Sequence, residues 1–137
     1  MKSEIRSVVQ RFASAFTTKD WDALKDILCA TILVDYSDIG QEKAEETAEE
    51  FVNKRKALYT DLDVHYLITP LKIGVNNTQA LCKAYSVIYR TQKFRFYNTH
   101  ATYVFGCVLE NGVWKIRSIK QGIICNEGLD QMYKLSN

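Results

Sequence analysis

The stretch FASAFTTKDWDALKDILCATILVDYS, residues 12–37, decides the fold. It begins inside an apolar stripe at helical spacing, which predicts a first helix over residues 3–16. A short second helix is predicted in KDWDALKDIL, with Thr18 as its cap, and the β-branched run at residues 31–37 is predicted to be a strand. The stretch therefore predicts two helices that lead into the first strand of a sheet.

The rest of the chain is predicted to add one more helix and four more strands. Residues 41–59 are predicted to form a third helix, because their acidic first half and basic second half suit the helix dipole. After residue 61 apolar and polar residues alternate, and Asn111-Gly112 is the strongest hairpin signal. The tail at residues 126–137 is compatible with a last helical turn. Strands are predicted over residues 62–73, 79–93, 94–109 and 113–124.

This order of elements predicts an α+β fold in a single domain over residues 1–137. Three N-terminal helices are expected to pack on a strongly curved, mostly antiparallel sheet. A long, twisted sheet wrapped over helices leaves a cone-shaped cavity between the two layers. Cavities of this kind bind small apolar ligands.

Composition and charge narrow the classes of function. The chain has 137 residues, of which 47% are hydrophobic, and its net charge of +2 is too small to indicate nucleic-acid binding. It contains no apolar run long enough to cross a membrane. The N-terminus MKSEIRSVVQRF lacks the apolar block of a signal peptide, which predicts a cytoplasmic protein with no membrane partner.

The cysteines predict neither a metal site nor disulfides. They are widely spaced, form no CxxC pair and have apolar neighbours, so we expect buried free thiols. No nucleotide-binding or zinc-protease motif occurs in the sequence, so we expect no cofactor and no metal. The cysteines are Cys29, Cys82, Cys107 and Cys125.

Two side chains are the first candidates for chemistry. His65 lies in the middle of LDVHYLITPLKI, residues 62–73, where neither strand face is cleanly apolar. It is therefore either a core residue or the working group of a pocket. Tyr36 ends the first strand, where it either points its hydroxyl into the cavity or packs at the sheet rim.

The next two strands supply candidates for binding. Arg90 and Gln92 follow small and apolar residues on one face of the 79–93 strand, as expected at the polar mouth of a cavity. A salt bridge at the sheet edge is the alternative for Arg90. Tyr103 is predicted to line the pocket, whereas His100 lies on the opposite face and is expected in an oligomer contact.

Three stretches resemble the nuclear transport factor 2-like superfamily, and more closely its SnoaL-like and scytalone dehydratase-like branch. They are residues 12–37, VHYLI at residues 64–68 and ENGVWKIRSIKQ at residues 110–121. The resemblance covers nearly the whole chain and implies a cone-shaped, cystatin-like α+β fold. Because this superfamily contains dehydratases, cyclases, isomerases and ligand binders, the fold alone does not name a reaction.

The resemblance can be carried over one position at a time. Scytalone dehydratase-like enzymes use a tyrosine at the end of the first strand, matched by Tyr36, and a histidine on the next strand, matched by His65. The aspartate that pairs with this histidine is replaced by Thr17, and the tyrosine before it by Phe16. A second histidine of the family corresponds to Gln92.

The resemblance implies a cofactor-independent acid/base enzyme, either a dehydratase, an isomerase or a cyclase. Its substrate would be a small, apolar, cyclic oxygenated metabolite of polyketide type, held in the cavity. His65 would be the base, and Tyr36 would polarise a carbonyl group. The alternative is a non-catalytic small-molecule-binding or assembly module, which the loss of the aspartate favours. Predicted substrate-binding residues are Phe16, Thr17, Arg90, Gln92, Tyr103 and Gln121.

The outer face of the long sheet predicts self-association. By alternation it carries a set of apolar side chains that is too large to stay exposed to water. We therefore expect a homo-oligomer, either a dimer or a trimer. The apolar set is Tyr85, Val87, Tyr89, Val104 and Val108.

Overall fold

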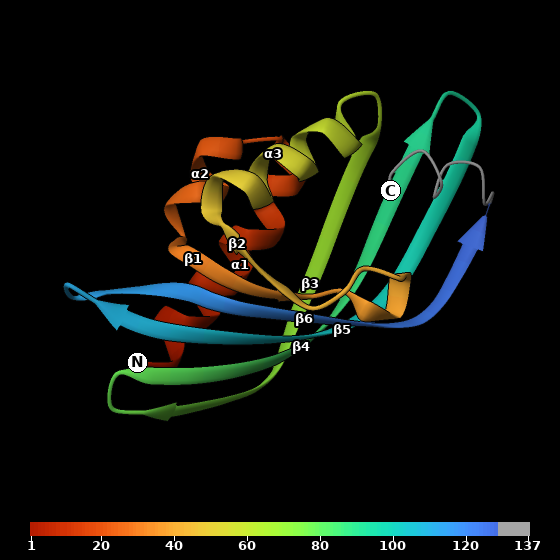
Figure 1. The fold of residues 1–137 in the computed structure, drawn as a ribbon. Coiled ribbons are helices and arrows are strands. Elements are labelled where there is room, and N and C mark those ends of the chain that lie inside the picture. The colour runs from red at the N-terminus through yellow and green to blue at the C-terminus, as the bar shows by residue number, and fades with distance from the viewer. Residues whose placement is uncertain (129–137) are drawn as a thin grey trace.

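The computed structural model describes residues 1–128 as helices grouped on one side of a bent sheet (Figure 1). The helices are α1 (Lys2–Thr18), α2 (Trp21–Asp26) and α3 (Ala48–Tyr59), with a 3-10 turn, η1 (Ser37–Ile39). The strands are β1 (Leu28–Asp35), β2 (Ala44–Thr47), β3 (Asp63–Asn76), β4 (Gln79–Gln92), β5 (Arg95–Glu110) and β6 (Val113–Gly128). Residues 126–128 end β6, and the rest of the predicted helical tail lies outside the described residues.

The corner between α1 and α2 is built from backbone geometry and one carboxylate. Lys19 ends α1 in the left-handed region at φ 55°. Asp20 then caps α2, because its carboxylate accepts the Ala23 N–H at 3.1 Å. The prediction that Thr18 caps α2 is wrong, since Thr18 still belongs to α1 and donates its hydroxyl to the Ser14 carbonyl.

The third helix is shorter than predicted, because residues 44–47 form β2 and pair antiparallel with β1. A capping box sets the true start of α3. Thr47 accepts the Glu50 N–H through its hydroxyl, and the Glu50 carboxylate accepts the Thr47 N–H, each at 3.1 Å. The helix therefore begins at Ala48.

The six strands form one sheet in the order β2-β1-β6-β5-β4-β3. Neighbouring strands are antiparallel except β1 and β6, which are parallel. The predicted hairpin at Asn111-Gly112 is confirmed, and both residues have the positive φ that this tight turn requires, 50° and 80°.

The sheet bends around the helices without closing into a barrel. Register shifts interrupt the β5–β6 pairing after His100 and after Gly106, and such bulges increase bending. Figure 1 shows β5 and β6 strongly bent, with all three helices on the same side of the sheet. The predicted fold class is confirmed. We call the face toward the helices the inner face and the opposite face the outer face.

The two faces are distinguished by burial along each strand. On β3, Val64 and Tyr66 are buried on the inner face, whereas His65 and Leu67 are exposed on the outer face. Helix α1 packs mainly on β3, so the core lies between α1 and the inner face. Within residues 1–128, none of the helices is both long enough and apolar enough to cross a membrane.

Candidate functional site

Aromatic side chains fill the centre of the cone. The Phe12 ring lies 5.1 Å from the ring of Phe16 and 5.1 Å from that of Phe105, measured between centroids. Tyr66 and Tyr103 complete this cluster at 5.9 and 6.2 Å from Phe12. All of these side chains are buried. The expected empty apolar cavity is therefore wrong for the centre of the cone, because large side chains occupy the inward positions.

Three tyrosine hydroxyls meet beside this cluster. Tyr66 donates to the Tyr103 hydroxyl, which also accepts a hydrogen bond from Gln121 Nε2 at 2.6 Å. Burial raises the pKa of Tyr66 and of Tyr103 well above the ordinary tyrosine value. Burial also raises the pKa of Tyr36, and the positive charge of Arg55 partly opposes this rise. The three hydroxyls therefore stay protonated at neutral pH and act as hydrogen-bond donors rather than bases.

A pocket of about 40 Å³, which we call the inner pocket, opens next to these hydroxyls. Its lining includes three half-buried apolar side chains, those of Ile39, Leu58 and Ile123, which we call the rim. Its polar lining comes from the segment between β1 and β2, from α3 and from strands β4 to β6. The polar residues are Tyr36, Gln41, Arg55, Tyr59, Arg90, Thr99 and Gln121.

Among the described residues, the inner pocket has hydrogen-bond donors and positive charge but no base. Among residues 1–128, none of its lining side chains is a carboxylate, an imidazole, a thiol or an amine. Its two cationic side chains, Arg55 and Arg90, are 4% and 5% exposed. Arg90 Nη1 donates to Thr99 Oγ1 at 3.0 Å and to the Tyr97 carbonyl at 3.3 Å. This arrangement can hold an oxygen-bearing group, but it offers nothing that would remove a proton.

Comparison with known proteins places this geometry in a family. The model of the SnoaL-like domain matches residues 1–120. The chain belongs to the SnoaL-like domain family. The resemblance inferred from the sequence is thereby confirmed. No curated protein sequence matches the chain.

Solved structures share the fold of this SnoaL-like protein. A protein from Kribbella flavida is 15% identical, with 98% of this chain and 95% of that chain covered and a TM-score of 0.86. A candidate scytalone dehydratase from Novosphingobium aromaticivorans is 12% identical, covering 93% and 87%, with a TM-score of 0.82. A type 2 hexachlorocyclohexane dehydrochlorinase is 15% identical, covering 93% and 88%, with a TM-score of 0.77. At these identities the likeness shows the fold alone.

The SnoaL-like fold brings several of the predicted residues together. Tyr36, Arg90 and Gln121 all line the inner pocket. Tyr103 lies one layer deeper, bound to Gln121. The alternative of a sheet-edge salt bridge for Arg90 is wrong, since within residues 1–128 Arg90 forms no ion pair and its side chain is buried.

His65 does not reach this site. Its side chain is exposed on the outer face, where its ring lies 6.4 Å from that of Tyr89. The expectation that His65 faces the cone interior is therefore wrong, and the inward residue is Tyr66. The physical reason is the two-residue period of a strand, by which a shift of one residue moves a side chain to the other face.

The other predicted binding residues have structural contacts. Phe16 stacks on Tyr66 with ring centroids 5.1 Å apart. Thr17 Oγ1 accepts the backbone N–H of Tyr66 at 2.8 Å, so it joins α1 to β3. Gln92 Nε2 donates to the Asp61 carbonyl at 3.5 Å, and Gln92 is not among the residues that line the inner pocket.

Sequence reasoning missed Arg55 and Tyr59 of the inner pocket. It explained the charges of the third helix by the helix dipole alone, yet the Arg55 guanidinium lies over the rings of Phe51 at 4.0 Å and Tyr36 at 4.8 Å. The signal was the helical spacing, because residues four apart share a face and Phe51, Arg55 and Tyr59 follow that interval. The face of α3 that packs inward therefore carries a positive charge.

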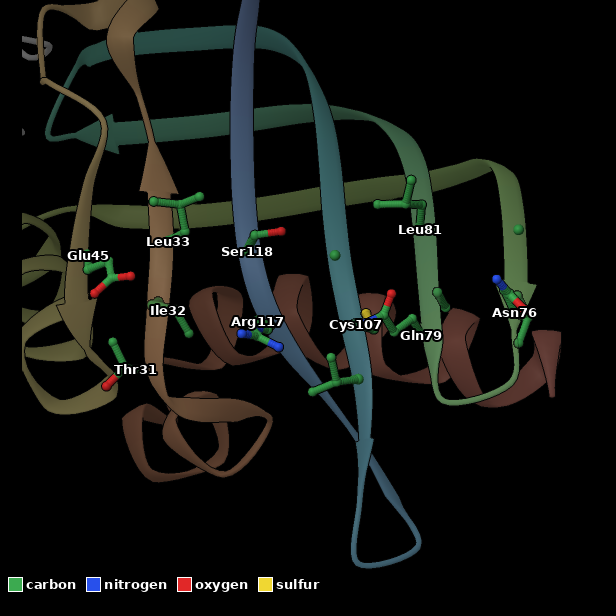
Figure 2. Close-up of a pocket in the computed structure, with 15 residues that line it drawn as sticks. Thr31, Ile32, Leu33, Glu45, Asn76, Gln79, Leu81, Cys107, Arg117 and Ser118 are labelled. Carbon is green, nitrogen blue, oxygen red and sulfur yellow. The ribbon is translucent and has the colours of Figure 1, made fainter.

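A wider hollow of about 1160 Å³ lies on the outer face, away from the inner pocket. Figure 2 shows Leu33, Ser118 and Leu81 on strands of this face, and the pairing register places them with Gly106 in one row across the sheet. Arg117 and Glu45 are its only charged lining residues within the described chain. The lining side chains that the structure describes include no group of residues suited to chemistry.

The expectation of buried free thiols is confirmed for three of the cysteines and is wrong for Cys125. Cys29, Cys82 and Cys107 are buried free thiols, and Cys125 is exposed. Burial raises the pKa of Cys107 to about 12, which keeps this thiol protonated and unreactive. Within residues 1–128, no three His, Cys, Asp or Glu side chains cluster as metal ligands would.

Proposed function

We propose that this SnoaL-like protein binds a small oxygenated molecule in the inner pocket and does not transform it by acid/base chemistry. The lining of the pocket carries the proposal. It offers tyrosine, glutamine and threonine donors together with two arginines, and among the described residues it contains no carboxylate or imidazole. These donors can bind an oxygen atom of a ligand. None of them can take up a proton from the ligand atom next to that oxygen.

An acid/base lyase or isomerase is the second candidate function. The names of the similar structures, a dehydrochlorinase and a candidate scytalone dehydratase, favour it. Such a reaction needs a group that takes up a proton near neutral pH. The raised pKa values of Tyr36, Tyr66 and Tyr103 argue against these tyrosines in that role.

The size of the pocket limits what can enter it. Pockets that enclose a whole drug-sized ligand measure roughly 300–1,000 Å³, whereas the inner pocket measures about 40 Å³. Only a head group of a few atoms would fit inside. The remaining body of the ligand would lie on Ile39, Leu58 and Ile123 at the rim. A small molecule with an apolar, cyclic body and an oxygenated head suits both regions.

Thermal unfolding with and without cyclic ketones and aromatic acids tests this function. A ligand at about 100 times its Kd would stabilise the folded protein by about 2.7 kcal/mol and raise Tm. We expect that rise in the wild type and a smaller one in Tyr36→Phe, which lacks a pocket hydroxyl. His65→Ala is the matched control and should respond like the wild type, because His65 lies on the outer face.

Two results would overturn the proposal. One is the absence of any ligand effect across the panel. The other is turnover of a panel compound that disappears in His65→Ala, which would restore the acid/base mechanism predicted from the sequence.

We also propose that the protein forms a homo-oligomer through its outer face. Leu67 and Tyr89 on this face are 48% and 40% exposed. Between them lies Val87, which pairs with Leu67 across β3 and β4. A contiguous apolar surface of this kind favours burial against another copy of the chain. His100 lies on the same face, where its ring contacts the Tyr85 hydroxyl and Glu127.

A further inference from the structure

The two arginines of the inner pocket come from different elements and meet at one place. Arg55 comes from α3 and Arg90 from β4, and both line the same pocket. Each side chain is at least nine-tenths buried, at 4% and 5% exposure. An arginine side chain keeps its charge in proteins. The fold therefore places two buried positive charges on the lining of one pocket.

Within the described residues, no counter-charge compensates either arginine. Within residues 1–128, no carboxylate forms an ion pair with Arg55 or Arg90. The Arg55 guanidinium lies between two aromatic rings, those of Phe51 and Tyr36. Arg90 uses Nη1 for two neutral acceptors, while its Nε is buried without a hydrogen-bond partner.

Burying such charges without counter-charges destabilises a protein. An ion moved from water into the interior costs several kcal/mol unless an opposite charge or a full set of hydrogen bonds compensates for it. Neutral acceptors and aromatic rings compensate only in part. Since this compensation is incomplete within residues 1–128, the two arginines favour the binding of an anion in the inner pocket.

The dimensions of the pocket select the kind of anion. A carboxylate is planar and matches the paired N–H donors of a guanidinium, and it adds few atoms to a volume of about 40 Å³. The hydroxyl of Tyr36 and the amide of Gln121 line the same space and can donate to it as well. The apolar rim, formed by Ile39, Leu58 and Ile123, would contact a hydrocarbon body attached to the carboxylate.

We propose that the ligand of the inner pocket is a small organic acid, with its carboxylate bound between Arg55 and Arg90 and its apolar body on the rim. This inference rests on the proposed binding function and specifies its ligand class. It predicts that the pocket binds a negatively charged ligand more tightly than a neutral ligand of the same shape, because the neutral ligand gives the two guanidiniums no opposite charge.

Isothermal titration at constant ionic strength tests the preference with benzoate and benzamide, which share a shape and differ in charge. A hydrogen bond to a charged group is worth about 1.5–3 kcal/mol, which is a factor of about 10 to 150 in affinity. We expect wild-type protein to bind benzoate at least about tenfold more tightly than benzamide. Equal binding of the two would overturn the carboxylate inference while leaving the binding function intact.

Variants show which side chains carry the preference. Arg55→Met and Arg90→Met keep a long side chain and remove the charge, so each should lower the benzoate affinity toward that of benzamide. Arg117→Met is the matched control, because Arg117 is exposed on the outer face and should leave both affinities unchanged. A benzoate preference that survives in the Arg55→Met/Arg90→Met double variant would overturn the assignment.

Unfolding without ligand separates a binding role from a structural one. If Arg90 has no anionic partner in the free protein, Arg90→Met should unfold at the same urea concentration as the wild type or at a higher one. A structural arginine would give the opposite result, and a large loss of stability would contradict the inference.

Formate distinguishes failure of the anion site from failure of the wider proposal. Formate is small enough to enter the inner pocket, but it has no apolar part that could contact the rim. Stabilisation by formate that depends on Arg90, with no gain from benzoate, would retain the anion site and refute the proposed apolar body. Stabilisation by none of the compounds would refute both proposals.

Discussion

Thr17 connects the first helix to the sheet through a single hydroxyl. Strand β3 is at the end of the strand order, so one of its edges has no neighbouring strand among residues 1–128. Thr17 Oγ1 accepts the Tyr66 N–H on this strand, and Gln10 Nε2 donates to the Ile68 carbonyl at 3.4 Å. Side chains of α1 therefore satisfy backbone groups that an exposed sheet edge would leave unpaired.

We expect Thr17→Val to lower the free energy of unfolding by about 1–3 kcal/mol, the usual cost of leaving a buried N–H without an acceptor. Valine keeps the shape of threonine and removes the oxygen, so packing against β3 changes little. Urea denaturation measures the change, and Thr17→Ser is the control because it retains the hydroxyl. Equal losses in the valine and serine variants would show that the methyl group, not the hydrogen bond, matters.

At the scale of elements, α3 is the helix that links the fold to the inner pocket. Its start is fixed by the capping box of Thr47 and Glu50, and its inward face carries Arg55 and Tyr59 into the pocket. Helix ends without such caps leave backbone N–H groups without partners. The position of one pocket wall therefore depends on two side chains at the N-terminus of the helix.

Thr47→Ala should lower the free energy of unfolding by about 1 kcal/mol, because the Glu50 N–H then lacks its acceptor. Thr47→Ser preserves the capping hydroxyl and should lose much less. Urea denaturation of the three proteins provides the comparison. If alanine and serine give the same stability, the capping box does not contribute to the fold.

At the scale of the whole molecule, the two faces of the bent sheet differ in what they bury and expose. Its inner face buries the aromatic cluster and three protonated tyrosine hydroxyls under the helices. Its outer face exposes apolar side chains. Both histidines lie on this face, where His65 is exposed and His100 is half-buried. Stability and self-association are therefore expected to depend on opposite faces.

The buried tyrosines predict loss of stability at alkaline pH. Tyrosines of the unfolded chain ionise near pH 10, whereas Tyr66 and Tyr103 hold their protons to higher pH in the folded protein. The unfolded state then binds fewer protons, so the stability that is complete below about pH 10 falls as the pH rises. The fall is about 1.4 kcal/mol per pH unit for each such tyrosine.

Urea unfolding at a series of pH values between about 8 and 11.5 measures this effect. Tyr66→Phe/Tyr103→Phe should show a shallower decline than the wild type, even if its stability at neutral pH is lower. Tyr89→Phe, which changes a tyrosine that is 40% exposed, should decline as steeply as the wild type. The same slope in all three proteins would contradict the role of the buried hydroxyls.

The outer face predicts a mass in solution of at least twice the 15.8 kDa of one chain. Leu67→Lys/Val87→Lys places two charges on the paired apolar residues of β3 and β4 and should give the monomer mass. Size-exclusion chromatography with light scattering measures the mass of the wild type and of this variant. Phe94→Lys, at a fully exposed position in the β4–β5 turn, is the control that should keep the wild-type mass. A monomeric wild type would refute the interface.

The sequence by itself determined the type and order of most elements, because periodicity, turn residues and helix caps act over a few neighbouring residues. It predicted the Asn111-Gly112 hairpin in this way, and together with the family resemblance it pointed to Tyr36, Arg90 and Gln121, which line the inner pocket. Only the tertiary structure decided which side chains converge. The pairing register turned Tyr66 inward and His65 outward, and the packing of α3 placed Arg55 on the lining of the pocket that Arg90 also lines. These outcomes depend on contacts between distant segments, where a shift of one residue exchanges the two faces of a strand.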